Sequence, residues 1–400
     1  MTTYKHFIPN QDESKVCDHF GLCGGCKLYD IPYTEQLILK QDRVKKELNR
    51  FDCVIDPIVP SPLRFHYRNK VEMTFFTDEN GKVGLGFHEK GQFNRFVNVR
   101  KCVLSPEENG ELLEHIREWA DHHDYPAYQK KTHEGLLRYL IIRDSFLEKN
   151  KLLILIAKEN SQALAASLAE TLKDHINIAG VIGSNQPEIA DAVLLNHQAL
   201  AYGQDYLFDQ IGHCRFKLPS NSFFQVNTAA ATLLYEHIRS CIRSGENVLD
   251  LFCGAGTISC YIADKAQSVF GIEVVESAIM SAADNAAINN VYNLSFTSGR
   301  VRERLANLYF IGSGEEQRLR YDAPQFDTII LDPPRSGTDK KTCARVAALK
   351  PRQIIYVACG FENLAYNLRS FIDAGYKINQ VLPFDFFPNT PHVEVFVQML

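Results

Sequence analysis

The sequence predicts an α/β protein in which a mixed α+β region precedes a doubly wound parallel sheet. Short alternating strands with turn signals fill the chain from Val54 to about Phe216, whereas strands and helices alternate from Pro219 onward. The second rhythm is typical of a parallel sheet with helices on both faces. The length of 400 residues suits two or three domains. We therefore expect one domain over residues 1–215 and another over residues 216–400.

Hydrophobic spacing predicts the elements of the first region. Leu37, Val44 and Leu48 recur at helical spacing among lysines, and this pattern indicates a helix from about Thr34 to Asn49. Alternation of apolar and polar residues, together with an Asn-Gly turn, indicates further elements. These are strands at Lys70–Thr77 and Leu152–Ala157 and an amphipathic helix at Ala163–Leu172.

In the second region buried strands alternate with helices. Short apolar runs bounded by turn residues predict the strands, and longer periodic runs predict the helices. The expected strands are Val248–Phe252, Ser268–Ile272, Asp327–Leu331, Gln353–Val357 and Val393–Leu400, and the expected helices are Thr257–Lys265 and Ser277–Asn289.

Composition excludes several classes of protein. Hydrophobic residues make up 45% and charged residues 23% of the chain, which is ordinary for a globular protein, and no apolar run approaches the roughly 20 residues of a membrane span. The first ten residues lack the pattern of a signal peptide, and eleven cysteines without an export signal indicate reduced thiols, so we expect a cytoplasmic protein.

The charge balance leaves nucleic acid open as a partner. The net charge of −5 argues mildly against a protein that coats nucleic acid. Residues 60–101, however, hold eight Lys and Arg against four Asp and Glu, so a local basic surface is one interpretation of this segment. An ordinary solvated face of strands and turns is the other.

A glycine-rich turn predicts a cofactor site. Asp250 ends a strand, and Gly254-x-Gly256 opens the next helix, where glycine lets the backbone pass close to a ligand. Glu273 ends the following strand and is placed to accept hydrogen bonds from both ribose hydroxyls. The third glycine of a dinucleotide fingerprint is replaced by Ser259, which favours S-adenosylmethionine over NAD.

Three reactive groups lie downstream of this turn. Asp332-Pro333-Pro334-Arg335 follows a buried strand, Cys359 follows another, and Glu394 lies at the start of the last strand. A thiolate that adds to C6 of uracil makes C5 nucleophilic, S-adenosylmethionine can then methylate C5, and a carboxylate can remove the C5 proton. Arg335 stands where enzymes that methylate exocyclic amines carry an aromatic residue, so the motif disfavours that chemistry.

Two further features surround Glu394 in the sequence. His392, two residues earlier, is an alternative candidate for the base. The segment Phe384-Asp385-Phe386-Phe387 offers aromatic side chains on which an unstacked base could stack.

Four cysteines predict a metal site. Cys17-x5-Cys23-x2-Cys26 supplies three thiols at close spacing, and Cys102 supplies a fourth from far along the chain. Four thiolates suit either a tetrahedral zinc ion or a [4Fe–4S] cluster, and the spacing alone does not separate the two.

With these motifs the chain closely resembles the RNA uracil-C5 methyltransferases that use S-adenosylmethionine. It is most similar to the branch that modifies 23S ribosomal RNA and carries an iron–sulfur cluster. The resemblance runs from Cys17 to the C-terminus and includes Tyr33, Gln36 and Leu37 after the cysteines, Tyr67-Arg68-Asn69-Lys70, Gly86-Phe87-His88-Glu89 and Phe223-Phe224-Gln225-Val226-Asn227.

The resemblance implies a fold and a set of site residues. Residues 216–400 would form a Rossmann-like class I methyltransferase domain, and residues 1–215 an RNA-binding middle domain whose helix at about 30–59 packs on the catalytic domain. Cys359 would be the nucleophile and Glu394 the base. A [4Fe–4S] cluster would be held by Cys17, Cys23, Cys26 and Cys102, and the cofactor and uracil by Gln225, Phe252, Thr257, Glu273 and Asp332.

The chain departs from the family pattern at three places. Gly360-Phe361 follows the nucleophile where the family usually has Asn or Asp and then Pro or Ala, and Arg300 stands at a polar position near the adenine. The chain also begins just before the cysteines, so we expect it to lack the N-terminal RNA-binding barrel of many members. RNA binding would then depend on the middle domain.

The expected function is therefore methylation of C5 of one uridine in 23S rRNA. We expect the protein to be a monomer that does not associate with a membrane. A tRNA T-loop methyltransferase with the same chemistry is the near alternative, and an inactive RNA-binding paralogue is the alternative of another class. Gly360-Phe361 favours the paralogue, while Cys359 and Glu394 argue against it. A cytosine-C5 enzyme would usually carry its nucleophile in a Pro-Cys pair at the position of Pro333-Pro334-Arg335.

Overall fold

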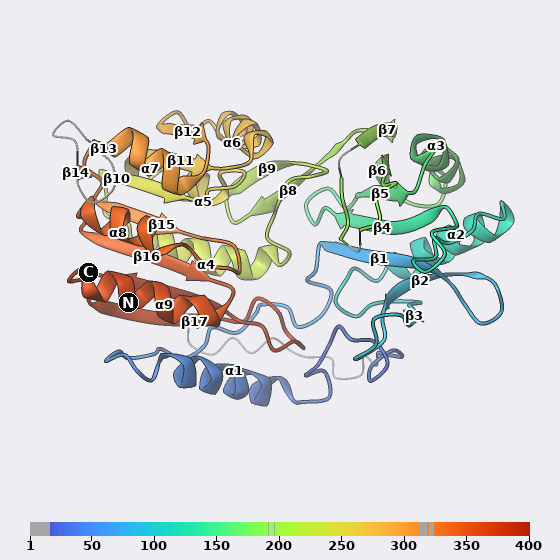
Figure 1. Cartoon of the computed structure of the whole chain (residues 1–400), viewed down its shortest axis with the longest axis horizontal. Coiled ribbons are helices and arrows are strands. Elements are labelled where there is room, and N and C mark those ends of the chain that lie inside the picture. Colours follow the sequence, from blue (N-terminus) through green and yellow to red (C-terminus); the bar gives the residue numbers. More distant parts are fainter. Residues whose placement is uncertain (1–16, 191, 196, 312–317, 320–323) are drawn as a thin grey trace.

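The structure, a computed structural model, describes residues 17–190, 192–195, 197–311, 318–319 and 324–400. Two seven-stranded sheets lie next to each other in it, each with its own helices (Figure 1). We call the sheet of β1–β7 with helices α2 and α3 the middle lobe. The C-terminal lobe is the sheet of β10–β12 and β15–β18 with helices α4–α9.

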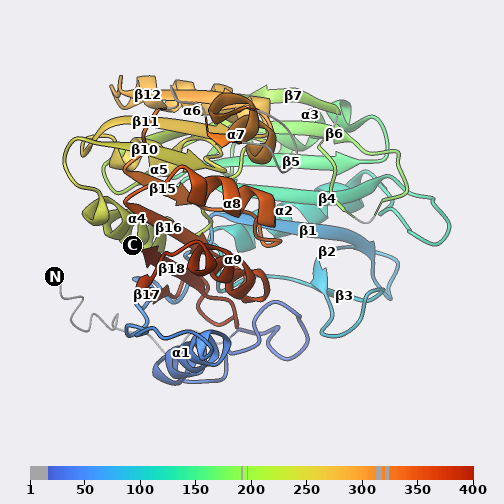
Figure 2. The ribbon, with the colours of Figure 1, turned by 60° about the vertical axis from the view of Figure 1, so that its left-hand side comes forward.

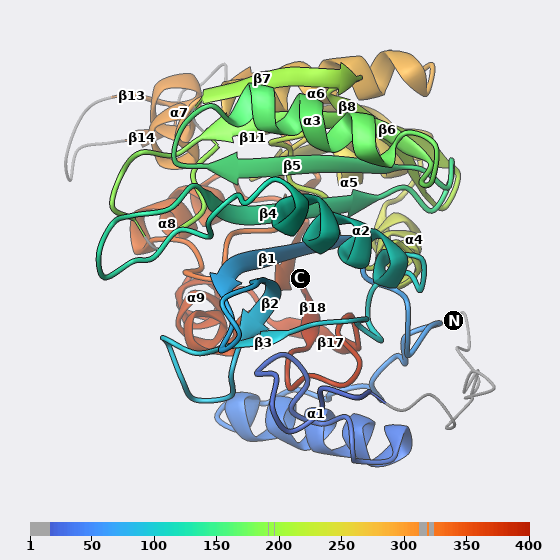
Figure 3. The same cartoon turned by 90° about the vertical axis from the view of Figure 1, so that its right-hand side faces the viewer.

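The middle lobe is a mixed sheet with the strand order β3-β2-β1-β4-β5-β6-β7, in which β5 and β6 pair in parallel. Helices α2 (Asn109–His122) and α3 (Ser161–Leu172) cover its outer face (Figure 3). The strands predicted at Lys70–Thr77 and Leu152–Ala157 are confirmed, whereas α2 was not predicted. The strands are β1 (Lys70–Thr77), β2 (Val83–His88), β3 (Phe96–Asn98), β4 (Leu137–Asp144), β5 (Lys151–Ala157), β6 (Ile178–Asn185) and β7 (His197–Gly203).

The C-terminal lobe has the strand order β12-β11-β10-β15-β16-β18-β17. In this order the first five strands, β12, β11, β10, β15 and β16, pair in parallel, and β18 runs antiparallel to both of its neighbours. The predicted α/β class of this region is confirmed. The strands are β10 (Glu246–Leu251), β11 (Ala266–Glu273), β12 (Leu294–Ser298), β15 (Thr328–Leu331), β16 (Gln353–Ala358), β17 (Ile378–Phe384) and β18 (Glu394–Met399). The helices are α4 (Thr228–Cys241), α5 (Thr257–Ile262), α6 (Glu276–Ile288), α7 (Val301–Tyr309), α8 (Lys340–Ala348) and α9 (Phe361–Asp373).

Both faces of this second sheet are buried, which explains why its strands are continuous apolar runs. Ile354 and Tyr356 of β16 belong to one hydrophobic cluster, while Ile355 and Val357 belong to the cluster on the opposite face. Alternate residues of one strand thus contribute to two separate cores. Helices lie on both sides of the sheet (Figure 2).

Two hairpins complete the described chain. Hairpin β8 (Tyr206–Ile211) and β9 (Cys214–Pro219) connects the lobes, because Leu207 packs in a middle-lobe cluster while Phe216 packs in a C-terminal one. A second, short hairpin consists of β13 (Phe310–Ile311) and β14 (Arg318–Leu319). The division of the chain at residue 215, which falls within β9, stays a prediction.

Helix α1 (Tyr33–Leu48) packs on the C-terminal lobe, although the middle lobe follows it in sequence. Its side chains Val44 and Leu48 are fully buried in a cluster that belongs to the C-terminal lobe, and the helix lies along that lobe beside α9 (Figure 1). Within the part of the chain that the structure describes, neither α1 nor any other helix has the length and apolar character of a membrane span.

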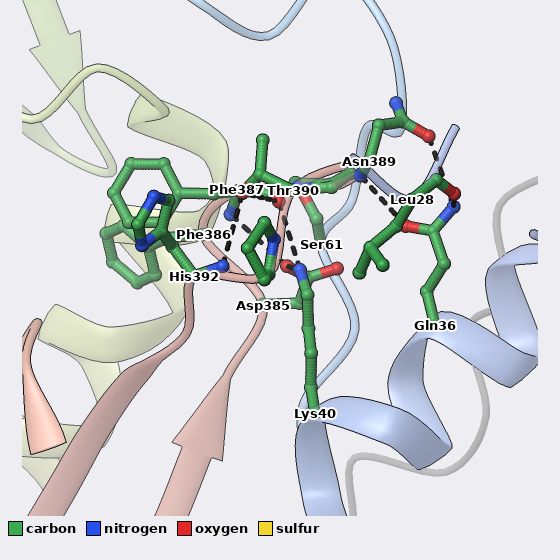
Figure 4. A network of polar contacts seen from close by, with 12 residues as sticks. Leu28, Gln36, Lys40, Ser61, Asp385, Phe386, Phe387, Asn389, Thr390 and His392 are labelled. Atoms are coloured by element: carbon green, nitrogen blue, oxygen red, sulfur yellow. Dashed lines mark hydrogen bonds and ion pairs between the residues drawn. The ribbon is translucent and has the colours of Figure 1, made fainter. Parts of the chain in front are cut away.

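A buried polar network fastens α1 to the segment that leads into β18 (Figure 4). The Lys40 ammonium is 1% exposed and forms an ion pair with the Asp385 carboxylate, and it also donates a hydrogen bond to the Phe387 carbonyl at 3.0 Å. Burial lowers the pKa of Lys40, although the Asp385 carboxylate opposes this shift. One turn earlier, Gln36 accepts a hydrogen bond from the Asn389 backbone N–H at 2.8 Å. Helix α1 thereby holds the whole loop 385–392 in place.

Asn389 has the φ of 66° that only a few residue types adopt readily. Its side chain compensates for this conformation because it donates to the Arg64 carbonyl at 3.1 Å and accepts from Gln36 and Arg64, each at 3.2 Å. Asn389 is completely buried, so each of these hydrogen bonds replaces one to water.

We expect Lys40→Met to destabilise the protein by about 3–5 kcal/mol, because it leaves the buried Asp385 carboxylate without its counter-ion. Urea unfolding followed by circular dichroism measures this loss. Lys45→Met is the matched control, since the Lys45 side chain on the same helix is 57% exposed and its ion pair with Asp42 is long, at 3.8 Å. Equal unfolding midpoints for the two variants would contradict a structural role for the Lys40 pair.

Candidate active site

The glycine-rich turn follows β10 with three residues in the left-handed region. Phe252, Gly254 and Gly256 have φ angles of 65°, 53° and 72°. A Cβ on Gly256 would lie 3.0 Å from the Ala282 Cβ, so this glycine is needed for close packing against α6. A Cβ on Gly254 would meet nothing within 4 Å, so the backbone here borders open space. The turn thus offers an accessible backbone surface to a ligand at the carboxyl edge of the sheet.

The Glu273 carboxylate lies beside this turn. It accepts hydrogen bonds from the backbone N–H groups of Gly254 at 3.2 Å, of Val274 at 2.7 Å and of Val275 at 2.9 Å. These contacts fix the carboxylate at the end of β11, where it is partly exposed. A carboxylate held in this way suits a diol ligand such as a ribose.

Ser259 has a role that the sequence did not indicate. It donates a hydrogen bond of 2.5 Å to the Asp250 carboxylate, which is completely buried. Burial raises the pKa of Asp250 to about 7, although the Ser259 hydrogen bonds oppose this shift. Ser259 occupies the place of a third glycine and supports this carboxylate.

Further polar side chains converge behind Asp332. Burial raises the pKa of Asp332 to about 7, and the nearby Asp250 carboxylate adds to the shift. The Tyr235 hydroxyl lies 2.9 Å from the Thr257 hydroxyl, and burial raises the pKa of Tyr235, with the Asp332 charge adding to the shift. The Gln225 side chain acts in the opposite direction and lowers the pKa of Tyr235, as Thr257 does. Tyr235 was not predicted, because an apolar-faced helix gives no sign of which tyrosine contacts a site.

Strand pairing brings Cys359 and Glu394 together. The register between β16 and β18 ends with Ala358 aligned with Val395, so Cys359 directly follows this pair on one strand and Glu394 directly precedes it on the other. Parallel pairing of β15 with β16 places Asp332 at the same edge of the sheet. The three candidate reactive groups, separated by up to 62 residues in sequence, therefore share one edge.

Burial governs the protonation of this pair. It raises the pKa of Cys359 to about 11, and the Glu394 and Asp332 charges add to the shift, while Arg335 lowers the value. Glu394 is 4% exposed, and burial, followed by the Asp332 charge, raises its pKa well above the ordinary range. Arg335 partly offsets this shift as well. A carboxyl group with a raised pKa is suited to act as a general base.

The structure gives a reason for Gly360. A Cβ at this position would lie 3.3 Å from the Arg335 carbonyl oxygen, which is closer than most side chains tolerate. The absence of a side chain lets Cys359 and Arg335 border one small crevice with Tyr356. The side chain of Phe361 lies outside the described residues.

Two predictions around Glu394 have different outcomes. The stacking surface expected from the aromatic segment is wrong for Phe384 and Phe386, which are 1% and 0% exposed and belong to the hydrophobic core. His392 is exposed at the end of the loop, and burial of part of its ring lowers its pKa, with the Arg335 charge adding to the shift. Its role as an alternative base stays a prediction.

Arg300 lies at the carboxyl end of β12, on the side of the sheet edge where the glycine turn lies. Its side chain is 74% exposed and pairs with Glu303 at 3.8 Å. This exposure leaves it available to a ligand, and its contact with adenine stays a prediction.

The four cysteines line one cavity of about 310 Å³ in the middle lobe. Cys17, Cys23 and Cys26 come from the segment before α1, and Cys102 comes from the loop before α2. Burial raises the pKa of Cys26 to about 12, and the other three thiols add to this shift in the order Cys102, Cys17 and Cys23. Among the described residues, no three His, Cys, Asp or Glu side chains converge as ligands of a single metal ion.

The cysteine segment contacts both lobes. The Gly24 N–H donates to the His88 carbonyl at 3.1 Å, at the end of β2. The Leu28 N–H donates to the Asn389 carbonyl at 3.0 Å, in the loop that leads to Glu394 (Figure 4). Only Lys27 therefore separates Cys26 from a residue that contacts the loop before the candidate base.

Comparisons with known proteins agree with this geometry. The model of the family described as tRNA (uracil-5-)-methyltransferase matches residues 32–400. An uncharacterised RNA methyltransferase of Caldanaerobacter subterraneus is 36% identical over 95% of this chain and 83% of the relative, and one of Bacteroides thetaiotaomicron is 32% identical over 94% and 86%.

The tRNA (uracil-54, C5)-methyltransferase of Pyrococcus abyssi, solved with S-adenosyl-L-homocysteine, has a similar structure. The TM-score is 0.78 at 26% identity, over 95% of this chain and 86% of that one. From the family match over residues 32–400, together with the identity to relatives along nearly the whole chain, it follows that the protein belongs to the tRNA (uracil-5-)-methyltransferase family.

Proposed function

We propose that this RNA methyltransferase transfers a methyl group from S-adenosylmethionine to C5 of a uridine in 23S rRNA through a covalent adduct with Cys359. The observation that carries the proposal is the position of Cys359 and Glu394 next to the last β16–β18 pair, with Asp332 at the same carboxyl edge of the sheet. A nucleophile and a base on adjacent strands can reach C6 and C5, which are adjacent atoms of one uracil ring.

In the first step the Cys359 thiolate adds to C6 of uracil, a carbon–sulfur bond forms, and the electron pair moves to C5 and O4 as an enolate. Burial and the Glu394 and Asp332 charges raise the pKa of Cys359 to about 11, and the Arg335 charge opposes this shift in favour of the thiolate. The Asp332 carboxyl group is placed to hydrogen-bond uracil N3–H. The pKa of about 7 lets this group retain its proton or lose it near neutrality.

S-adenosylmethionine supplies an electrophilic methyl group, which C5 takes up. Glu394 then removes the C5 proton, the electron pair re-forms the C5–C6 double bond, and Cys359 leaves C6 as a thiolate. The raised pKa of Glu394 makes its carboxylate a stronger base than an exposed one. The products are 5-methyluridine, S-adenosylhomocysteine and one proton.

We assign the cofactor contacts to Gln225, Phe252, Thr257 and Glu273, with Asp332 between cofactor and uracil. The left-handed turn at Phe252 with its open space above Gly254 supports this assignment, as does the fixed Glu273 carboxylate. The Thr257 hydroxyl lies 2.9 Å from the Tyr235 hydroxyl, and Gln225 affects the pKa of the same tyrosine, which supports a common location for the two contacts.

We propose further that Cys17, Cys23, Cys26 and Cys102 hold a [4Fe–4S] cluster. The cavity they share, about 310 Å³, is larger than one metal ion needs. Four irons and four sulfides spread their thiolate ligands more widely than a tetrahedral zinc ion, whose Zn–S bonds are about 2.3 Å. The size of the cavity therefore supports the cluster over a single zinc ion. We infer that it orders the cysteine segment, because methyl transfer needs no electron transfer.

Two RNA targets compete. The resemblance to the iron–sulfur branch favours 23S rRNA. The similarity to the Pyrococcus abyssi tRNA (uracil-54, C5)-methyltransferase over 95% of the chain favours the tRNA T-loop. The chemistry is the same in both, so only the RNA contacts separate these functions. The division into domains of residues 1–215 and 216–400 remains part of this proposal.

We expect the protein to methylate unmodified 23S rRNA, and Cys359→Ala to abolish the reaction while S-adenosylmethionine affinity stays within a few-fold. Labelled methyl donor with mapping of 5-methyluridine in rRNA and tRNA measures the activity and names the target. The Cys359 thiol should also form a stable adduct with RNA that contains 5-fluorouridine, because fluorine cannot leave as a proton. Cys241→Ala, another partly buried cysteine, is the control. Full activity of Cys359→Ala would exclude the nucleophile.

We expect Glu394→Gln to attack and methylate ordinary uridine but to stall before release, because a glutamine amide is no base and elimination must wait for the C5 proton. A covalent protein–RNA complex should accumulate on denaturing gels. His392→Ala is the paired variant, since His392 is the alternative base. Normal turnover of Glu394→Gln without any adduct, together with a stalled adduct in His392→Ala, would transfer the role to His392.

We expect anaerobically purified protein to be brown and to contain iron and sulfide, and Cys26→Ala to be colourless and less stable, because sites built around a metal lose stability without it. Cys53→Ala, a partly buried cysteine outside the cavity, should keep the colour. Absorbance, metal analysis and thermal melting measure the difference. A colourless wild-type protein with one zinc ion per chain would overturn the cluster.

A further inference from the structure

The inner face of the middle sheet carries a second concave surface. Helices α2 and α3 cover the outer face, and the opposite face is directed toward the C-terminal lobe (Figures 1 and 3). Over β4, β5 and β6 that inner face packs against Leu207 of β8. Over β1 and β3 it lines a groove of about 640 Å³, which lies within the size range of ligand sites.

Aromatic rings form the floor of this groove. Phe76 of β1 and Phe96 of β3 stack with centroids 5.3 Å apart and an angle of 19° between their planes. His88 continues the row, with its ring 4.5 Å from that of Phe96. Phe93, which also lines the groove, is 87% exposed. A bulky exposed aromatic next to a stacked row is a surface on which a further flat ring can stack.

Gly84 explains how the row is placed. A Cβ on this residue would lie 2.4 Å from the Phe76 ring, so the ring lies flat across the backbone of β2. A side chain at position 84 would force the ring upward and fill the groove. The strand thus gives up a side chain at a position where an aromatic ring needs the space.

Basic residues line the walls. The residues that border the groove include four with positive charge, Arg95, Lys130, Lys131 and Arg138, against two with negative charge, Asp78 and Glu79. The Arg138 guanidinium lies 4.3 Å from the Tyr128 ring centre and donates to the carbonyls of Gln186, Glu188 and Ala190, so it stiffens the wall. The exposed Arg95 lies at the rim, where it forms an ion pair with Glu89 at 2.9 Å that a phosphate would compete with.

We propose that this groove binds unpaired nucleotides of the substrate RNA, with one or more bases stacked on the aromatic row and their phosphates facing Lys130, Lys131 and Arg95. The inference rests on the proposed function, because it takes the occupant to be the RNA that is methylated. Flat apolar rings beside an excess of cations match a single-stranded nucleic acid, which combines flat bases with a charged backbone.

Strand β1 connects the groove to the candidate active site. At its start, the Asn69 side chain donates to the Gln225 carbonyl at 3.0 Å, next to the proposed cofactor contacts. Phe76 lies seven residues farther along an extended chain, which is roughly 20 Å at about 3.3 Å per residue. The groove would therefore bind nucleotides that lie several positions from the methylated uridine. It would contribute to substrate specificity and not to the chemical step.

The test combines Phe93→Ala with Phe96→Leu, which removes two rings but keeps apolar volume at the half-buried position. Fluorescence anisotropy with a labelled fragment of the methylated RNA measures affinity. We expect roughly tenfold weaker binding, since stacking on aromatic side chains commonly contributes this much per base. The Michaelis constant for RNA should rise while kcat at saturating RNA and S-adenosylmethionine affinity stay unchanged. Tyr292→Ala, which removes an aromatic residue that is 86% exposed on the C-terminal lobe, is the control.

A second pair of variants tests the phosphate contacts. Lys130→Gln with Lys131→Gln should flatten the dependence of the logarithm of affinity on the logarithm of salt concentration, because fewer counterions are then released on binding. Circular dichroism and thermal melting show whether each variant is folded.

The outcomes separate this inference from the function itself. Folded groove variants that bind and methylate RNA as the wild type does would show that the groove does not bind the substrate RNA, and that it is empty or binds a protein partner. This result would leave the methyltransferase function intact. A wild-type protein that methylates no RNA would defeat the proposed function. The anisotropy measurement would still decide whether the groove binds single-stranded RNA.

Discussion

The reversed direction of β18 is the constraint on which the candidate site depends. In a parallel sheet all carboxyl ends lie at one edge, so β15 and β16 deliver Asp332 and Cys359 there as they end. A strand that runs the other way reaches the same edge only with its first residue. Glu394 is that residue, and the register with β16 places it directly before the last β16–β18 pair, which Cys359 directly follows. The chain must therefore cross the edge of the sheet just before β18, in loop 385–392. Helix α1, the buried Lys40–Asp385 pair and the hydrogen bonds of Asn389 all stabilise this crossing.

Much of the C-terminal lobe could be predicted because local sequence and tertiary structure agree there. Its strands are apolar on both faces and end in chemically distinctive residues. The sequence therefore predicts that Asp250, Asp332 and Cys359 lie at the carboxyl edge of the sheet. The failures have physical reasons too. Lys40 belongs to a lysine-rich helix, and nothing local distinguishes a lysine with a buried partner 345 residues away from its exposed neighbours. Phe384 and Phe386 have the composition of a stacking surface, but Phe384 ends β17, which pairs with β18, and both rings are buried in the hydrophobic core. Two side-chain contacts could not be predicted, because packing alone decides where the helices lie. They are the hydrogen bond of Ser259 to Asp250 and the contact of Tyr235 with Thr257.

The cysteine segment connects features that the sequence presents separately. Its backbone bonds to the end of β2 on one side and to loop 385–392 on the other. His88, whose carbonyl accepts one of these bonds, also ends the aromatic row of the groove. The segment thus contacts two functional regions, the loop that leads to Glu394 and the surface where we propose that RNA binds. The cluster that we propose would have a use in such a position even with no redox task, because it would fix a short, polar segment that has few apolar residues to fix it otherwise.

The position of β18 between β16 and β17 has a consequence for the time course of synthesis. The strand occupies an interior place in its sheet although it is the last element of the chain. Val44 and Leu48 of α1 belong to the same core, so they wait for about 350 further residues to be translated. At bacterial elongation rates this takes about 20 to 70 s. During that interval the nascent chain displays an apolar helix face and an open sheet edge, both of which attract chaperones or neighbouring chains. The candidate active site thus depends on α1 and β18, two elements that lie about 350 residues apart in the chain.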